Sequence, residues 1–388
     1  ILYLYNQFFM QSSNIDKISV PSFQFTSDVD RHLHKICKLI IKSKLYFEKF
    51  IIKEQTFQLK SVSNIHPNKF ISNYSSYPSF IQDHLETIEK NLITFSFTIK
   101  QRTFYINIIT KKNQQFDLDH YIEFIYRWLY VCSHFPSDKT CSQVLHIYLF
   151  PSQFKKLFPK TKTTLDVENC NTAFTTSCQP ETSIHIYREE EWFKVFIHET
   201  FHSMGLDFSE MNQYSVNKYL KKYFPLSIQD FKLYECYCEM FAELIHIMFS
   251  CVEYEKEELF ISKLKDKIKE QQKFALLQTV KILHHYDITY DAFVKENYTY
   301  NEKTPVFSYY ILKSFLFLHI DEYLDWCFHH NNSIQFNKTN ENLNNFCVFI
   351  TNLHEDKYKS FKIILQNIVK DIGKDKDKTL KMTINDFP

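Results

Sequence analysis

Glycine is almost absent from this sequence, which contains only two in 388 residues. Alanine is nearly as rare, whereas phenylalanine (39) and tyrosine (25) are abundant. Residues with AT-rich codons are favoured over those with GC-rich codons, which indicates an AT-rich genome more than a particular fold. Since glycine is the residue that adopts positive φ without a steric penalty, each glycine that remains is expected to serve a steric purpose.

An excess of charge is also missing, because 46 Lys and Arg residues face 45 Asp and Glu residues and the net charge is +1. This balance offers no attraction to nucleic acid or to an anionic membrane. No apolar run reaches the ~18 residues of a membrane helix. The apolar opening, 1–11, has neither a basic segment nor a small-residue cleavage site, so no signal peptide is expected. We expect neither a nucleic-acid nor a membrane partner.

The ten cysteines form no CxxC pair and no tight cluster of the kind that predicts disulfides. In a chain of this length, such spacing predicts reduced thiols and an intracellular location.

The order of the predicted elements indicates an α+β fold, with strands first and helices after. Alternating residues around a short polar turn at 100–102 predict a β-hairpin. Beyond 204 the chain is predicted to be nearly all helix, and the charged tail from 374 is expected to fray. The expected domains are a mixed N-terminal segment (1–93), a core (94–252) and a helical C-terminal region (253–388). Within the core we expect strands at 94–100, 103–110, 143–150, 171–177 and 182–188, and helices at 118–133 and 189–204, the latter with acidic residues in its first turn.

The stretch HETFHSMGLD, residues 198–207, carries the clearest chemical signal. His198 and His202 are four residues apart, so on a helix both imidazoles project from one face and can share a metal ion. Two neutral imidazoles suit Zn²⁺, and Glu199 is placed to take a proton from a zinc-bound water. Random order would give about 0.05 such HExxH matches in this chain, so the motif predicts a zinc site.

Gly205 follows the second histidine by three residues, where the helix must end and the chain must turn away. A glycine just beyond a helix end commonly adopts the left-handed conformation. We therefore expect Gly205 at the C′ position of this helix.

A catalytic zinc needs a third protein ligand and an open position. The extended HExxHxxGxxH/D pattern would place that ligand at 208, which is Phe208, and Asp207 is one position short. A following helix, 234–246, offers carboxylates instead. Glu235, Glu239 and Glu243 are spaced by four and share one face, and the helix is apolar on its other face. Glu239 is the predicted ligand, with Glu235 as the alternative.

Glu239, Ala242 and Glu243 form an E-x-x-A-E sequence. Together with HExxH it resembles the gluzincin pattern of the zincin metallopeptidases, over residues 94–252. The resemblance implies a zincin-like core, in which a twisted mixed sheet is followed by the active-site helix and a glutamate helix. It also implies that Glu239 binds zinc and that Glu243 holds a ligand histidine. The 37-residue gap from His202 to Glu239 is longer than in many gluzincins, so Glu235 stays open as the ligand.

The composition and the stretch IYREEEWFKVFIHETFHSMGLDFS also resemble metallopeptidase-like proteins of large DNA viruses. For a viral protein, the expected location is the host cytoplasm or the virion.

The resulting expectation is a zinc-dependent peptidase that acts on a protein or peptide substrate, with Glu199 as general base. The strand at 171–177 is the candidate for binding the substrate backbone, with Ala173 kept small beside the cleft. Tyr309 and Tyr310 are candidates for stabilising the oxyanion. The alternative is a zincin-fold structural or binding protein, such as a virion component, without peptidase activity.

Overall fold

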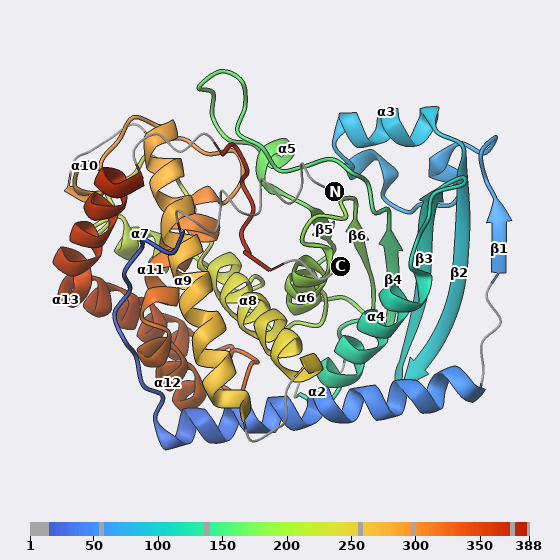
Figure 1. Ribbon diagram of the computed structural model, residues 1–388, viewed down its shortest axis with the longest axis horizontal. Helices are drawn as coiled ribbons and strands as arrows, with labels where there is room; N and C mark the ends of the chain where they lie inside the picture. Colours follow the sequence, from blue (N-terminus) through green and yellow to red (C-terminus); the bar gives the residue numbers. More distant parts are fainter. Residues whose placement is uncertain are drawn as a thin grey trace.

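The computed structural model describes residues 15–53, 58–135, 140–254, 259–295, 300–372 and 377–385. A six-stranded mixed sheet lies at one end of the molecule, and most of the helices gather at the other (Figure 1). This arrangement is consistent with the α+β class. The expectation about a signal peptide falls on residues 1–11, which lie outside the described ranges.

The strands of the sheet follow the order β1-β2-β3-β4-β6-β5. The expected hairpin is present as the antiparallel pair β2–β3, whereas β3–β4 and β4–β6 are parallel. β5 runs antiparallel to β6 at the edge of the sheet. The mixed sheet is therefore confirmed. Its strands are β1 (Gln58–Ser61), β2 (Lys90–Ile99), β3 (Arg102–Lys111), β4 (Val144–Leu149), β5 (Ala173–Thr175) and β6 (Glu181–Ile186).

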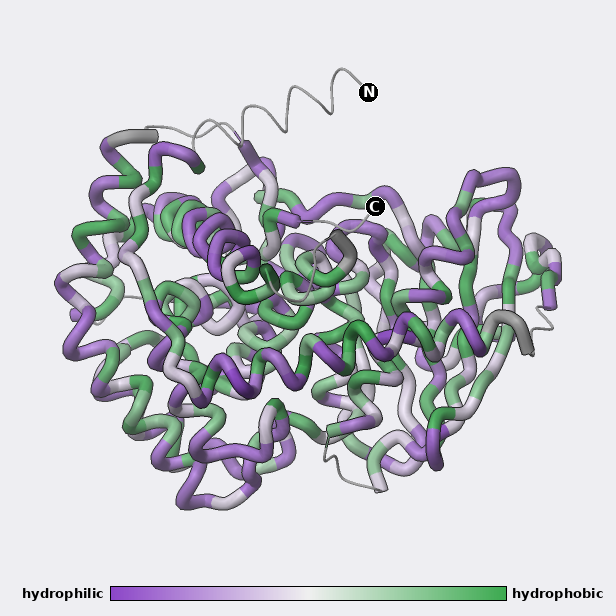
Figure 2. The backbone as a smooth tube through the Cα atoms, turned by 60° about the horizontal axis from the view of Figure 1, so that its bottom comes forward, coloured by the Kyte–Doolittle hydropathy of each residue, from purple (hydrophilic) through white to green (hydrophobic). Residues whose placement is uncertain are grey.

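Both faces of the sheet are covered, because alternate side chains of each strand point to opposite sides. Phe104, Ile106 and Ile108 of β3 belong to the main hydrophobic core, on the helical side. Ile109 belongs to a smaller core on the other side, which is closed by residues 62–85. The main core includes residues of all three predicted domains, and hydrophobic residues concentrate in the middle of the molecule (Figure 2). The domain boundaries themselves remain a prediction.

The helices pack mainly on one side of the sheet and beside it (Figure 1). The long helix α2 runs along one edge of the molecule, against α4, α8 and α12. The α-helices are α2 (Ser27–Lys53), α3 (Ser79–Thr87), α4 (Leu118–Cys132), α5 (Val167–Cys170), α6 (Trp192–Ser203), α7 (Tyr214–Leu220), α8 (Leu233–Tyr254), α9 (Phe260–His285), α10 (Tyr290–Lys295), α11 (Lys313–Leu318), α12 (Ile320–His330) and α13 (Asn340–Ile372). The described ranges also contain short helical turns at η1 (Pro67–Lys69), η2 (Tyr74–Ser76) and the π-helical η4 (Phe307–Leu312).

The start of α6 differs from the sequence prediction, because the helix begins at Trp192 and has no acidic residue in its first turn. Glu191 precedes the helix with a φ of 60°. Its buried carboxylate pairs with Lys156 and accepts hydrogen bonds from the backbone N–H groups of Met382 and Thr383. The acidic residue therefore anchors distant parts of the chain instead of interacting with the helix dipole.

The C-terminal segment 377–385 does not fray, contrary to the prediction for this part of the tail. Leu380 and Met382 are buried, and Thr379 forms an antiparallel bridge with Leu157. The charged residues around them had masked two apolar side chains in TLKM that reach the core. Figure 1 shows the segment passing between the helical region and α6.

Cys141 and Cys178 form a disulfide, so the prediction that every thiol is reduced is wrong. These residues precede β4 and β6, which are parallel neighbours, and their Cα atoms lie 4.8 Å apart. A contact over 37 residues depends on strand order, which the cysteine spacing does not reveal. The other eight cysteines, all within the described ranges, are buried and form no disulfide.

Candidate metal centre

Helix α6 carries His198 and His202 into the interior. The helix is apolar on most of its surface, and all of its side chains are buried. It packs against β5, β6 and α8. Because the two histidines are one turn apart, both rings face α8, and their Nε2 atoms lie 3.1 Å from each other. Two imidazoles buried this closely need partners.

Glu235, in the first turn of α8, supplies a third polar atom at the same place. Its Oε2 lies 3.1 Å from Nε2 of His198 and 3.3 Å from Nε2 of His202. Among the described residues, these three side chains form one of two groups whose ligand atoms are close enough to hold a metal ion. We call His198, His202 and Glu235 the metal group.

The geometry of the metal group fits a tetrahedral ion. Zinc bonds to nitrogen and oxygen are ~2.0–2.2 Å long, which places neighbouring tetrahedral ligand atoms about 3.3–3.5 Å apart. The three distances of 3.1, 3.1 and 3.3 Å are close to that spacing. Two imidazoles and one carboxylate also form a donor set that catalytic zinc sites use. The residues present therefore fit a zinc ion.

The carboxylate that groups with the two histidines is that of Glu235, which the sequence left open as the alternative to Glu239. Oε1 of Glu239 lies 3.0 Å from Nδ1 of His198, the ring nitrogen that faces away from Glu235. This contact brings opposite charges together without the alignment of a good hydrogen bond. Since Glu235 and Glu239 are one turn apart on one helix face, the predicted pattern is displaced by a single turn.

His202 has a carboxylate partner of its own. Its Nδ1 lies 2.6 Å from Oδ2 of Asp207, whose Oδ1 accepts a hydrogen bond from Ser209. Cys238 lies 3.8 Å from the same nitrogen, and these residues form the second possible metal group. Since that group would use the nitrogen already engaged by Asp207, we assign Asp207 to orienting the ring. Sequence spacing had argued against Asp207 as a ligand and indicated no other role for it.

The charges of the metal group act on one another. Burial favours the neutral imidazole of His198, but Glu235 and Glu239 raise its pKa above the usual value. Burial would raise the pKa of Glu235, yet His202 and His198 bring it well below the usual range. The carboxylates around the two histidines therefore stabilise positive charge at this site.

Glu199, the predicted general base, lies beside this cluster. It is 8 % exposed, and the charges of His198, His202 and Glu235 act on its carboxylate. Burial raises the pKa of Glu199, although the two histidines counteract part of the effect. A base with a raised pKa accepts a proton more readily.

Gly205 ends α6 as predicted, with a φ of 63°. Its N–H donates to the carbonyl of His202, and the N–H of Leu206 donates to that of Phe201. These two bonds form a Schellman motif. A Cβ at this position would lie 2.9 Å from Sγ of Cys141, in the disulfide, so both the backbone and the space require glycine.

The two predicted oxyanion tyrosines have different positions. The hydroxyl of Tyr309 donates to Oε2 of Glu235 over 3.2 Å, so this ring lies at the metal group. Tyr310 donates to the carbonyl of Leu380 over 2.6 Å, in the C-terminal segment. Both lie on the π-helical turn η4, a conformation often found at functional sites. Only Tyr309 is placed to act near the two histidines.

Two buried lysines near the site were missed by the sequence analysis. Nζ of Lys194 lies 2.8 Å from both oxygens of Glu239. Nζ of Lys313 lies 2.8 Å from Glu243, which therefore contacts a lysine and not the ligand histidine that the resemblance implied. A lysine in the apolar stretch WFKVFI was the signal that could have indicated a buried partner.

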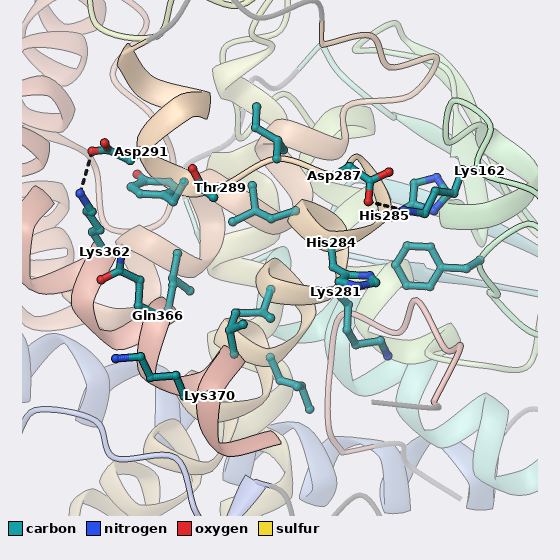
Figure 3. Close-up of a pocket in the computed structure, with 18 of the residues that line it drawn as sticks. Lys162, Lys281, His284, His285, Asp287, Thr289, Asp291, Lys362, Gln366 and Lys370 are labelled. Carbon is teal, nitrogen blue, oxygen red and sulfur yellow. Dashed lines mark hydrogen bonds and ion pairs between the residues drawn. The ribbon is translucent and has the colours of Figure 1, made fainter. Parts of the chain in front are cut away.

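A cavity of about 870 Å³ lies elsewhere, between α9, α10 and α13 (Figure 3). Lys281, Asp291 and Lys362 are among its lining residues, and the metal group is not. A search for a functional site based on this cavity alone would therefore not have led to the histidines. Within the described ranges, no helix is both long and apolar enough to cross a membrane.

Comparison of the chain with protein-family models, with curated proteins and with solved structures gave no match.

Proposed function

We propose that this protein is a zinc-dependent peptidase in which His198, His202 and Glu235 bind the metal and Glu199 is the general base. The observation that carries the proposal is the convergence of three ligand atoms within 3.1–3.3 Å of one another, beside a buried glutamate. A purely structural site needs ligands but no base. The HExxH motif supplies both on one helix.

Zinc bound by these residues would polarise the scissile carbonyl and lower the pKa of a coordinated water. Glu199 would accept a proton from that water and later pass it to the leaving amine. Tyr309, whose hydroxyl already reaches the site, would donate to the oxygen that becomes negative. Asp207 and Glu239 would keep the two imidazoles facing the metal.

The edge strand β5 favours a peptide as the substrate in this proposal. Thr172 and Thr176 bond to β6 through their backbones, so the peptide groups of Ala173 and Thr175, between them, point away from β6. Within the part of the chain that the structure describes, these groups have no backbone hydrogen-bond partner, so a substrate strand could pair with them. α6 packs directly against β5, so such a strand would lie close to the helix that carries the histidines. The likeness to a zincin fold belongs to the same proposal.

One observation favours the alternative, a structural or binding protein. The side chains of the metal group are only 5–14 % exposed, so little of the site meets solvent in this conformation. Under that alternative the protein binds zinc and cleaves no peptide.

Glu199→Gln tests the proposal because it removes the base and no ligand. We expect the variant to retain about one zinc per chain and to lose hydrolysis of a peptide library by about 10²–10⁴-fold. Zinc content is measured by elemental analysis and cleavage by mass spectrometry. Zinc-loaded parent protein that cleaves nothing in the library would favour the structural alternative, and loss of zinc in the variant would make Glu199 a ligand.

A further inference from the structure

A buried cluster of four charges lies behind His198. It consists of Lys194, Glu239, Lys313 and Glu243, whose side chains are at most 3 % exposed. Burying charges is costly unless each is well paired, and replacing such a cluster with apolar residues is often neutral or stabilising. Stability alone is therefore a weak reason for its presence.

The contacts in this charge cluster centre on Glu239. Lys194 binds both oxygens of its carboxylate, and Nζ of Lys313 lies 3.3 Å from Oε2. Oε1 also lies 3.0 Å from Nδ1 of His198. Two ammonium groups thus bind the carboxylate, and one of its oxygens also contacts the histidine.

The C-terminal segment completes the surroundings of the two lysines. The carbonyl of Met382 accepts hydrogen bonds from Lys313 over 3.1 Å and from Gln271 over 2.8 Å. Sδ of Met382 lies 3.6 Å from Nζ of Lys194. The positions of both ammonium groups therefore depend on a segment that is distant in sequence and threaded into the core.

We propose that Lys194 and Lys313 are positioning residues that hold Glu239 against Nδ1 of His198, so that Nε2 of this ring faces the metal. The inference rests on the proposed metal centre. A partner on the outer nitrogen of a ligand histidine fixes its tautomer and ring orientation. Without the lysines, nothing in the charge cluster would keep the Glu239 carboxylate in place, and its contact with His198 is not a well-aligned hydrogen bond.

Lys194→Met tests this role, with Arg127→Met as the matched control. Arg127 is equally buried, at 0 % side-chain exposure, and pairs with Glu123 instead of Glu239. Both variants remove a buried, paired cation and should lower the melting temperature. Only Lys194→Met should weaken zinc binding, by about 10-fold or more, as measured by competition with a chelator. Equal losses of zinc affinity in the two variants, or no loss in either, would overturn the proposal.

A double-mutant cycle tests whether Lys194 acts through Glu239. In a Glu239→Gln background, Lys194→Met should cost little further zinc affinity, because coupled residues are not additive. Fully additive losses would contradict the proposed route. If Lys194→Met does not fold, Lys194→Arg, which keeps the charge but displaces it, takes its place in both measurements.

The tautomer of His198 supplies a measurement that needs neither zinc nor activity. Long-range proton–nitrogen NMR correlations of the zinc-free parent, at a pH where the ring is neutral, should place the proton on Nδ1. Lys194→Met should shift this tautomer equilibrium, and an unchanged tautomer would overturn the positioning role. A parent protein that binds no zinc would defeat the proposed function, while the tautomer would still test the role of the lysines.

Discussion

Histidines are buried in two kinds of surroundings in this molecule. Burial opposes the charged form of His198 and His202, but the carboxylates around them, together with Cys238 beside His202, raise the pKa of both rings. His185 on β6 and His246 on α8 are equally buried, but burial lowers the pKa of each to about 3. Nδ1 of His185 contacts the hydroxyl of Tyr77, which bears no charge.

The difference separates ligand candidates from core histidines. A ring such as His185, buried beside a hydroxyl group and aromatic side chains, is stable as a neutral imidazole and needs no cation. His246 is kept neutral by burial and by the positive charge of Lys194.

Lys194 and Lys313 pair with Glu239, so the charge of that carboxylate is already balanced. Around the two rings, the excess of negative charge comes from Glu235 and Asp207. A divalent cation would balance it, so the surroundings indicate function more clearly than burial does.

Of the substitutions that test this comparison, Glu235→Ala should have the largest effect on zinc affinity. Glu235→Ala takes away a proposed ligand, so zinc affinity should fall well beyond the ~10–100-fold that loss of an outer partner costs. Glu243→Gln is the comparison: this carboxylate lies on the same helix face but contacts Lys313 in the charge cluster, so its loss should cost no more than that of an outer partner. Chelator competition measures both. Similar affinities for Glu235→Ala and the parent would return Glu239 to consideration as the ligand.

Asp207→Asn should have the next largest effect. The variant keeps the size of the side chain but removes the charge that faces Nδ1 of His202, so zinc should bind about 10–100-fold more weakly. Ser209→Ala, which removes only the hydroxyl bonded to Asp207, should cost much less. If zinc affinity is unchanged in Asp207→Asn, the carboxylate does not orient this histidine.

The neutral histidines should make the free energy of unfolding depend on pH. The folded pKa of His246 is about 3, and the unfolded value is near 6.5. Between these values the unfolded chain binds a proton that the folded chain does not, so stability falls as pH decreases. From pH 7 to pH 5 this residue should cost on the order of 2 kcal/mol.

Urea unfolding of the zinc-free protein at pH 7 and pH 5 measures this cost. His246→Leu should lose less stability over the interval than the parent, because the titrating ring is gone. An identical loss in parent and variant would mean that His246 is not held neutral, and would remove one side of the comparison between the two kinds of histidine.

Local patterns predicted much of the fold and part of the site. Alternation predicted the β2–β3 hairpin, and the i, i+4 spacing placed His198 and His202 on one face of α6. The choice between Glu235 and Glu239 could not be predicted in this way. Residues four apart share a helix face, and the level at which α8 crosses α6 decides which one meets the histidines.

Long-range contacts account for the features that sequence patterns missed. Lys194 meets Glu239 across two helices, and Met382 reaches both buried lysines from the far end of the chain. The Cys141–Cys178 disulfide depends on β4 and β6 being neighbours. Each requires knowledge of which elements pack together, which periodicity and spacing do not contain.

Gly205→Val should have the smallest effect, on stability first and on zinc second. A β-branched residue at a φ of 63° is strained, and we expect a loss of about 1–2 kcal/mol. Its Cβ would also crowd Sγ of Cys141 at 2.9 Å. Any shift of the helix end moves His202, two residues before the cap Met204, so zinc affinity should weaken modestly.

Two further variants separate the causes of this loss. Asn tolerates the left-handed conformation, so Gly205→Asn keeps the crowding and relieves much of the backbone strain. Adding Cys141→Ala to Gly205→Val relieves the crowding and leaves the strain. Thermal melting with and without chelator measures all of them, and only a zinc-dependent part of the loss would link this turn to the metal group. If Gly205→Val melts and binds zinc like the parent, the turn tolerates a side chain, and the rarity of glycine in this chain says nothing about the end of α6.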